Sequence, residues 1–225
     1  MKAYRIHEYG DAAKFIEDEV NKPSAKKGHV VVEVKASSLN PIDHKFLKRD
    51  LGINPALPGI LHMDVAGVIT EVGEGVTAFK TGDEIYGCAG GLQGEAGNIE
   101  GALADFMLAD SNLIALKPKS LSFSESAALP LVTITAWEGL FDRAHIKKED
   151  HVLIHGGTGG VGHIAIQLAR KHGARVATTV SSEDKAKVAR GLGAEDIIFY
   201  RDEKVEDYTQ RLTKSRGFDV VFDTI

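Results

Sequence analysis

The chain has 225 residues, which is enough for one large domain or two small ones. Hydrophobic residues make up 43% of it, charged residues make up 26%, and the net charge is -5, so we expect no nucleic-acid partner and no membrane span. The single cysteine, Cys88, excludes an internal disulfide, and the first residues do not resemble a signal peptide, so we expect a cytoplasmic protein.

The first half of the sequence predicts strands joined by turns. The N-terminal segment MKAYRIHEYG alternates apolar and polar residues, which predicts an edge strand. Residues 30–35 have the same period-two pattern, and Ala66–Val72 repeats it. Glycine-rich turns separate these segments, and a long turn-rich stretch runs from Gly87 to Gly101. Many short strands with glycine turns predict a small barrel-like β-domain.

The pattern becomes helical after Pro118. Ser124 before Glu125 is a helix-start signal within the segment Ser122–Ala128. The segment Leu131–Phe141 is the next predicted helix, although Thr133, Ile134 and Thr135 lower its helix propensity.

From His151 onward, predicted strands and helices alternate. The predicted strands are His151–His155, Ala174–Val180, Asp196–Phe199 and Phe218–Asp223. The predicted helices are Gly160–His172, Glu183–Leu192, which Gly193 ends, and Glu203–Leu212. This alternation with short connections predicts a parallel, doubly wound sheet.

The fold class expected from these patterns is α/β, with a β-domain at residues 1–124 and the first part of a dinucleotide-binding domain at residues 125–225. The sequence stops on a predicted strand, and the open sheet of the dinucleotide fold usually has about six strands. We therefore expect the chain to be truncated at its C-terminus relative to the natural protein. A complete, compact variant is the alternative.

A glycine-rich segment, HGGTGGVG at residues 155–162, joins the first strand of the second half to its first helix. Gly157, Gly159 and Gly162 fit the G-x-G-x-x-G pattern of a dinucleotide-binding turn. We expect the first glycine to permit a tight turn, the second to let the backbone approach a pyrophosphate, and the third to let the helix pack close to the strand. The predicted cofactor contacts here are Gly157, Thr158, Gly159, Gly160, Val161 and Gly162. A glycine-rich turn without a ligand is the alternative.

The end of the second strand of this half indicates which cofactor is bound. NAD sites usually place an acid there to hold the ribose 2′-hydroxyl, but here Val180 is followed by Ser181 and Ser182. Glu183 and the acid after it are typical of the first turn of a helix capped by Ser182. The serines together with Lys185 favour NADPH over NADH, and a solvated helix lysine is the alternative for Lys185.

The sequence resembles the medium-chain dehydrogenase/reductase superfamily and, within it, the zinc-free quinone oxidoreductases, which include zeta-crystallin. The resemblance rests on motifs that follow one another along nearly the whole chain: SLNPID at 38–43, DVAGVITEVGEGV at 64–76, FKTGDEIYG at 79–87, HGGTGGVG at 155–162 and LGAEDIIFY at 192–200. It implies an N-terminal GroES-like β-domain followed by a Rossmann domain, in chains about half as long again as this one.

The resemblance also bears on zinc. The zinc alcohol dehydrogenases of the superfamily have a cysteine at the position of Asn40 and a histidine at the position of Met63, and their structural zinc lobe has four cysteines where this chain has only Cys88. We therefore expect no metal site and no zinc. A zinc site built from His62, Asp64, His44 and Asp43 is the alternative.

Further roles follow from the resemblance. It implies that Ser181, Lys185 and Tyr200 meet the 2′-phosphate of NADPH, that Asn40 lies near the nicotinamide and the substrate, and that Thr135 faces the cofactor. For Trp137 we prefer simple packing within a domain-linking helix.

The function implied is an NADPH-dependent oxidoreductase that transfers hydride to a quinone or an α,β-unsaturated carbonyl without a metal, with Asn40 as a catalytic hydrogen-bond donor. A zinc-type alcohol dehydrogenase or an enoyl-thioester reductase on the same scaffold is one alternative. A non-catalytic NADPH-binding protein, crystallin-like or regulatory, is another. We expect a small-molecule partner and a homodimer or homotetramer.

Overall fold

The computed structural model of the protein describes residues 1–94 and 97–225. The chain divides into two compact units, Met1–Leu131 and Val132–Ile225, and each is described by itself. The boundary expected between residues 124 and 125 stays a prediction, and the short helix α2 (Phe123–Ala127) lies within the first unit.

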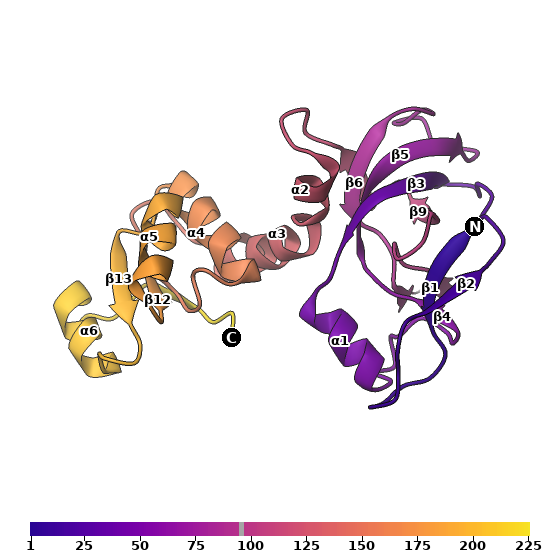
Figure 1. Ribbon diagram of the computed structural model, residues 1–225. Helices are drawn as coiled ribbons and strands as arrows, with labels where there is room; N and C mark the ends of the chain where they lie inside the picture. The colour runs from indigo at the N-terminus through magenta and orange to yellow at the C-terminus, as the bar shows by residue number, and fades with distance from the viewer. Residues whose placement is uncertain (95–96) are drawn as a thin grey trace. The chain divides into compact units, whose positions relative to one another are not determined.

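The first unit is built on an antiparallel sheet of five strands in the order β10-β6-β5-β3-β9 (Figure 1). Its strands are β3 (His29–Ser38), β5 (Asp64–Val72), β6 (Glu84–Cys88), β9 (Phe106–Asp110) and β10 (Ile114–Leu116). Val32, Ile69, Ile85 and Met107 are buried in its core, and the predicted segments do form strands. The expected alternation is not seen in β3, because Val30, Val31 and Val32 are all buried. Helix α1 (Pro41–Lys48) follows β3 directly.

The N-terminal strand β1 (Lys2–Ile6) is not the edge strand that the sequence predicted. It lies in the middle of a small sheet, between β2 (Ile16–Glu19) and β4 (Gly59–Ile60). Alternating polarity reports that one face of a strand is buried, but it carries no information about how many neighbours pair with its edges. The turn-rich stretch 87–101 contains the strands β7 (Leu92–Gly94) and β8 (Gly97–Ile99), and its residues 95–96 lie outside the described residues.

The second unit contains the predicted parallel sheet, with four strands in the order β13-β12-β11-β14 among the described residues. The strands are β11 (His151–Ile154), β12 (Arg175–Val180), β13 (Asp196–Phe199) and β14 (Val220–Phe222). Helices α4 (Gly160–His172) and α5 (Glu183–Leu192) pack on one face, and α6 (Val205–Thr213) contributes Tyr208 to the other face (Figure 1). A GroES-like β-domain and a Rossmann sheet are therefore confirmed.

The ends of helices α2 and α5 show which of the predicted capping signals were right. Ser122, not Ser124, caps α2: its hydroxyl accepts a hydrogen bond from the Glu125 N–H at 3.2 Å, and the Glu125 carboxylate accepts one from the Ser122 N–H at 2.8 Å. This reciprocal pair requires the acid three residues after the cap, so the predicted start was two residues late. Gly193 ends α5 with a left-handed φ of 111°, as predicted.

The predicted helix 131–141 changes type along its length. It begins as the α-helix α3 (Pro130–Trp137) and continues as the π-helix η1 (Glu138–Arg143). The wider turn of a π-helix shifts the side chains that follow it, and such segments often occur at functional sites.

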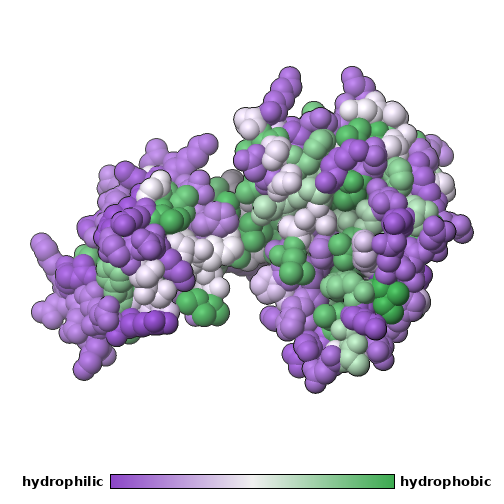
Figure 2. All heavy atoms as spheres, viewed as in Figure 1, coloured by the Kyte–Doolittle hydropathy of each residue, from purple (hydrophilic) through white to green (hydrophobic). Residues whose placement is uncertain are grey.

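Hydrophilic side chains cover most of the face seen in Figure 2, with hydrophobic groups in smaller areas among them. In the part of the chain that the structure describes, no helix combines the length and the apolar character needed to cross a bilayer.

Gly162 lets α4 lie close to the turn that precedes it. A Cβ atom at this position would overlap the carbonyl oxygen of Gly156 and would come within 2.9 Å of the Cα atom of Gly157. Both obstacles are backbone atoms, which cannot swing aside as a side chain can. The predicted role of Gly162 in close packing therefore has a direct geometric cause.

We expect Gly162→Ala to lower the free energy of unfolding by about 1–3 kcal/mol, because the helix must shift to relieve the overlap. Gly191 in α5 is a matched control, since nothing lies within 4 Å of the Cβ atom it would gain. Gly191→Ala should stabilise the chain by about 0.5–1 kcal/mol through helix propensity. Urea unfolding followed by circular dichroism measures both, and equal effects at the two positions would contradict this packing argument.

Candidate functional site

A hollow of about 290 Å³ lies in the second unit where β11, β12 and β13 end. Its lining residues are Gly156, Thr158, Gly159, Thr179, Val180, Ser181, Lys185, Tyr200, Thr224 and Ile225. In open parallel sheets the carboxyl ends of the strands are where ligands bind, because the loops there are free to carry recognition groups. The predicted glycine turn, the serine after β12 and the tyrosine after β13 are thus brought to one place.

The glycine turn is formed differently from the way the sequence predicted. The left-handed residue is Gly156, with φ 66°, whereas Gly157, expected to make the tight turn, is not left-handed. Gly157 is required for another reason: a Cβ there would overlap the hydroxyl of Thr178 on β12. Gly159 caps α4, and its N–H donates to the Gly156 carbonyl at 2.8 Å.

The helix start next to the hollow is open to a ligand. The cap residue Gly159 has no side chain, and the first turn of α4, which includes Gly160, Val161 and Gly162, has no acidic residue. The first N–H groups of a helix have no partner within the helix and carry the positive end of its dipole. An anion is therefore the ligand that this end of the helix favours.

The side chains that line the hollow include a positive charge and no acidic group. Lys185 is the cation among the lining residues, and no Asp or Glu lines the hollow in the described part of the chain. Glu183 forms an ion pair with Arg190 at 2.8 Å and Asp184 forms one with Lys187 at 3.4 Å, so both acids after β12 are paired along α5.

Of the other residues predicted to bind the 2′-phosphate region, Tyr200 lines the hollow and Ser182 does not. The Ser182 hydroxyl accepts a hydrogen bond from the Lys185 N–H at 3.4 Å, which confirms the predicted helix cap, but Ser182 does not line the hollow. Tyr200 is 50% exposed, and the guanidinium of Arg201 lies 5.8 Å from the centre of its ring. Sequence reasoning missed Thr179 and Thr224, since a threonine within or after a buried strand has no distinctive pattern.

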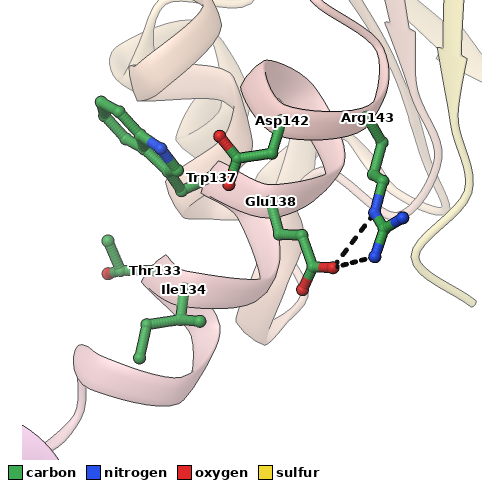
Figure 3. Close-up of a pocket in the computed structure, with 6 residues that line it drawn as sticks. All are labelled: Thr133, Ile134, Trp137, Glu138, Asp142 and Arg143. Carbon is green, nitrogen blue, oxygen red and sulfur yellow. Dashed lines mark hydrogen bonds and ion pairs between the residues drawn. The ribbon is translucent and has the colours of Figure 1, made fainter. Parts of the chain in front are cut away.

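A second hollow, of about 530 Å³, lies along α3 and η1 (Figure 3). Ile134 and Trp137 line it and are about half exposed, and the Arg143 guanidinium donates to the Glu138 carboxylate at 2.8 Å. Trp137 does pack, against Phe141 with 4.5 Å between the ring centres, but half of its surface is exposed to this hollow or to solvent. A run of apolar residues does not reveal which face of a helix stays exposed.

Thr135 lies on the same helix and lines neither hollow. It follows three residues after Val132, whose side chain lies beside Gly160 at the start of α4. Side chains three apart share one side of a helix, so this placement is compatible with the role predicted for Thr135, which stays a prediction.

Asn40 lies in the first unit, within a buried group of polar side chains around Asp64. Its side-chain amide donates to Asp64 Oδ2 at 2.9 Å and to the Ser38 hydroxyl at 3.2 Å. Asp64 also accepts the Ser38 hydroxyl at 2.7 Å and the Leu131 N–H at 2.9 Å. Both N–H groups of Asn40 are therefore in use, which leaves its carbonyl Oδ1 as the group open to a further partner.

The carboxyl of Asp64 is fully buried, and this affects the groups around it. Burial raises the pKa of Asp64, although the hydrogen bonds from Ser38, Asn40 and Leu131 act in the opposite direction. Burial, and then the Asp64 charge, raise the pKa of the Cys88 thiol to about 12. Cys88 is thus an unreactive thiol at neutral pH.

Three of the four alternative zinc ligands, His62, Asp43 and Asp64, make other contacts. The His62 ring Nδ1 lies 2.9 Å from the Ser37 hydroxyl, and its backbone N–H donates to Asp43 at 3.1 Å. Burial lowers the pKa of His62. Within the described residues, no three or more His, Cys, Asp or Glu side chains are grouped so that they could hold a metal ion.

We expect Cys88 in the folded chain to react with iodoacetamide at pH 8 about a hundred to a thousand times more slowly than in urea, where its pKa returns to about 8.5. Because the pKa is raised, the native rate should keep rising with pH, without a plateau, up to pH 10. As the only cysteine, Cys88 can be followed by intact mass. A native plateau near pH 8.5 would contradict the assigned environment.

Two family models match the chain. Residues 26–119 match the alcohol dehydrogenase GroES-like domain, and residues 160–225 match the zinc-binding dehydrogenase family. The two matches fall in the β-sheet unit and in the parallel-sheet unit respectively.

Curated relatives match the whole chain. It is 40% identical to 2-methylene-furan-3-one reductase of Solanum lycopersicum and 36% identical to the chloroplastic NADPH-dependent alkenal/one oxidoreductase of Arabidopsis thaliana, and each match covers 100% of this chain and 57% of the relative. It is 31% identical to the quinone oxidoreductase of Rattus norvegicus, of which it covers 66%. The chain thus spans less than two thirds of the length of these relatives.

Solved structures have the same fold. An alcohol dehydrogenase superfamily protein from Novosphingobium aromaticivorans matches with a TM-score of 0.92 and 39% identity, over 100% of this chain and 66% of that one. The Escherichia coli quinone oxidoreductase complexed with NADPH matches with a TM-score of 0.85 and 29% identity, over 99% and 66%. These findings confirm the resemblance stated from the motifs: the chain belongs to the medium-chain dehydrogenase/reductase superfamily, in the branch that holds the quinone oxidoreductases.

Proposed function

We propose that this chain binds NADPH in the hollow beside the glycine turn and serves a two-electron reduction of a quinone or an α,β-unsaturated carbonyl. The observation that carries the proposal is the composition of that hollow, which combines a helix start without a side-chain cap with one lysine and no Asp or Glu among the described lining residues. Such a site favours a dinucleotide that carries a 2′-phosphate beside its pyrophosphate over one whose adenosine ribose has a free 2′-hydroxyl.

The pyrophosphate would lie at the start of α4. There Thr158 and Gly159 line the hollow, and the N–H groups of Gly160, Val161 and Gly162 belong to the first turn of the helix. The absence of a side chain at Gly157 and Gly162 lets the turn pack against Thr178 and lets α4 start close to the turn.

The 2′-phosphate would lie at the other end of the same hollow. Lys185 supplies a full positive charge, and Ser181 and Tyr200 supply hydroxyl groups. Ser182, which caps α5, would act by fixing the direction of the helix that carries Lys185. NADH would leave this charge without a partner, so we propose that it binds less tightly.

When bound, NADPH supplies the hydride. The acceptor classes are those named for the relatives, an alkenal or enone and a quinone. We propose turnover without zinc, since Asn40 and Met63 are poor zinc ligands. We also propose a cytoplasmic protein that forms a homodimer or homotetramer.

Asn40 was predicted to donate a hydrogen bond to the substrate, but its N–H groups already have acceptors in the protein. Because Asp64 and Ser38 already accept both of its N–H groups, we propose that Asn40 offers Oδ1 as a hydrogen-bond acceptor to a bound group. The oxygen of the reduced substrate would then be met by other donors, with water as a source of the proton. Asp64 would act as a positioning residue that sets the direction of the Asn40 amide.

We expect Lys185→Met to raise the KM for NADPH about ten- to a hundredfold and to leave the KM for NADH within about twofold, because only NADPH carries the phosphate that the ammonium meets. Lys187→Met is the matched control, since Lys187 lies on the same helix, is paired with Asp184 and does not line the hollow. Equal losses for both cofactors would contradict this assignment.

NADPH oxidation with a panel of quinones and enones, using chelator-treated and metal-analysed protein, tests the reaction itself. We expect turnover that does not depend on added zinc. Stoichiometric zinc that is required for turnover would favour the alcohol dehydrogenase alternative, and tight NADPH binding without turnover across the panel would favour a non-catalytic protein.

A further inference from the structure

The glycine turn is held in place by one residue of the neighbouring strand, Thr179 of β12. The N–H of Gly156 donates to the Thr179 hydroxyl oxygen at 3.0 Å, and the N–H of Gly157 donates to the Thr179 carbonyl at 3.3 Å. Thr179 is only 3% exposed, so water does not compete freely for these bonds. We propose that Thr179 is a positioning residue for the cofactor pyrophosphate, an inference that rests on the proposed function of the hollow.

The two hydrogen bonds divide the amides of the turn into two groups. Gly156 and Gly157 direct their N–H groups at β12, whereas the N–H of Thr158, the next residue, has no hydrogen bond within the described residues and belongs to a residue that lines the hollow. Gly156 needs its left-handed conformation to make this change of direction. Fixing the first two amides therefore fixes where the following ones point.

The adjacent residue, Thr178, sets the depth of the turn. It is fully buried, its hydroxyl donates to the Ile154 carbonyl at 2.7 Å, and its oxygen occupies the space that a Cβ at Gly157 would need. On the opposite side, the Thr224 hydroxyl donates to the His155 carbonyl at 2.6 Å. The turn is thus held from both sides, and Thr179 is the residue that accepts the N–H groups of both Gly156 and Gly157.

The chemical requirement at position 179 is a hydroxyl oxygen that can accept a hydrogen bond, and it is separate from size. Valine has nearly the same shape as threonine but cannot accept, so Thr179→Val would remove the protein acceptor of the Gly156 N–H. Serine keeps the acceptor and loses only a methyl group. The Gly157 bond to the backbone carbonyl is available in both variants.

Thr213 provides a matched control in the same unit. Its hydroxyl also accepts a glycine N–H, that of Gly217 at 2.9 Å, and it donates to the Thr209 carbonyl. It is 8% exposed, lies at the end of α6, and does not line the hollow. Thr213→Val therefore removes the same kind of bond without touching the turn.

The test compares Thr179→Val, Thr179→Ser and Thr213→Val in the intact chain by three measurements. Amide hydrogen exchange of the ligand-free protein reports on the turn, NADPH titration reports on the whole cofactor, and 2′-AMP titration reports on the end without a pyrophosphate. For Thr179→Val we expect Gly156 to exchange at least about tenfold faster and NADPH to bind about tenfold more weakly, while 2′-AMP stays within about twofold. Thr179→Ser and Thr213→Val should resemble the wild type in all three.

The outcomes separate the inference from the proposed function. Unchanged exchange at Gly156 in Thr179→Val would overturn the positioning role even if the wild type binds NADPH. Equal losses for NADPH and 2′-AMP, or the same losses in Thr213→Val, would show a general destabilisation and would also overturn it. Failure of the wild-type chain to bind NADPH would overturn the proposed function, and the cofactor role of Thr179 with it, whatever the exchange data show.

Discussion

The candidate site depends on how closely the glycine turn approaches strand β12. At Gly157 and Gly162 the neighbouring atoms leave no room for a side chain, and at Gly156 the backbone is left-handed. These are three separate steric demands, and together they explain why glycine is needed at each position. The hydrogen bonds from Gly156 and Gly157 to Thr179 then convert this close approach into a fixed orientation of the backbone.

The charges around the hollow favour an anionic ligand. The chain has a net charge of -5, yet the hollow presents a helix start without a side-chain cap and Lys185, and no Asp or Glu lines it in the described residues. Ion pairs with Arg190 and Lys187 hold the acids Glu183 and Asp184 along α5. These surface pairs add little stability, and neither acid lines the hollow in which an anion would bind.

In the first unit, a buried acid orients the polar side chains around it. Asp64 accepts hydrogen bonds from Ser38, Asn40 and Leu131, and burial raises its pKa because the charged form loses its hydration. This arrangement orients the Asn40 amide, and burial together with the Asp64 charge raises the pKa of the Cys88 thiol. The chemistry that these two polar side chains can offer thus depends on their burial beside Asp64, which no spacing of residues in the sequence would reveal.

The sequence by itself determined the α/β class, the parallel order implied by alternating strands and helices, the α4 and α5 boundaries and the position of the glycine turn, because periodicity and capping act over a few residues. Only the tertiary structure decided that β1 is central, that Ser122 caps α2, and that Gly156 rather than Gly157 makes the tight turn. It also brought Thr179 to the turn and both Asn40 N–H groups to Asp64 and Ser38. The physical reason is that strand pairing, close backbone approach and buried hydrogen bonds join residues far apart in the chain, and local patterns carry no record of such partners.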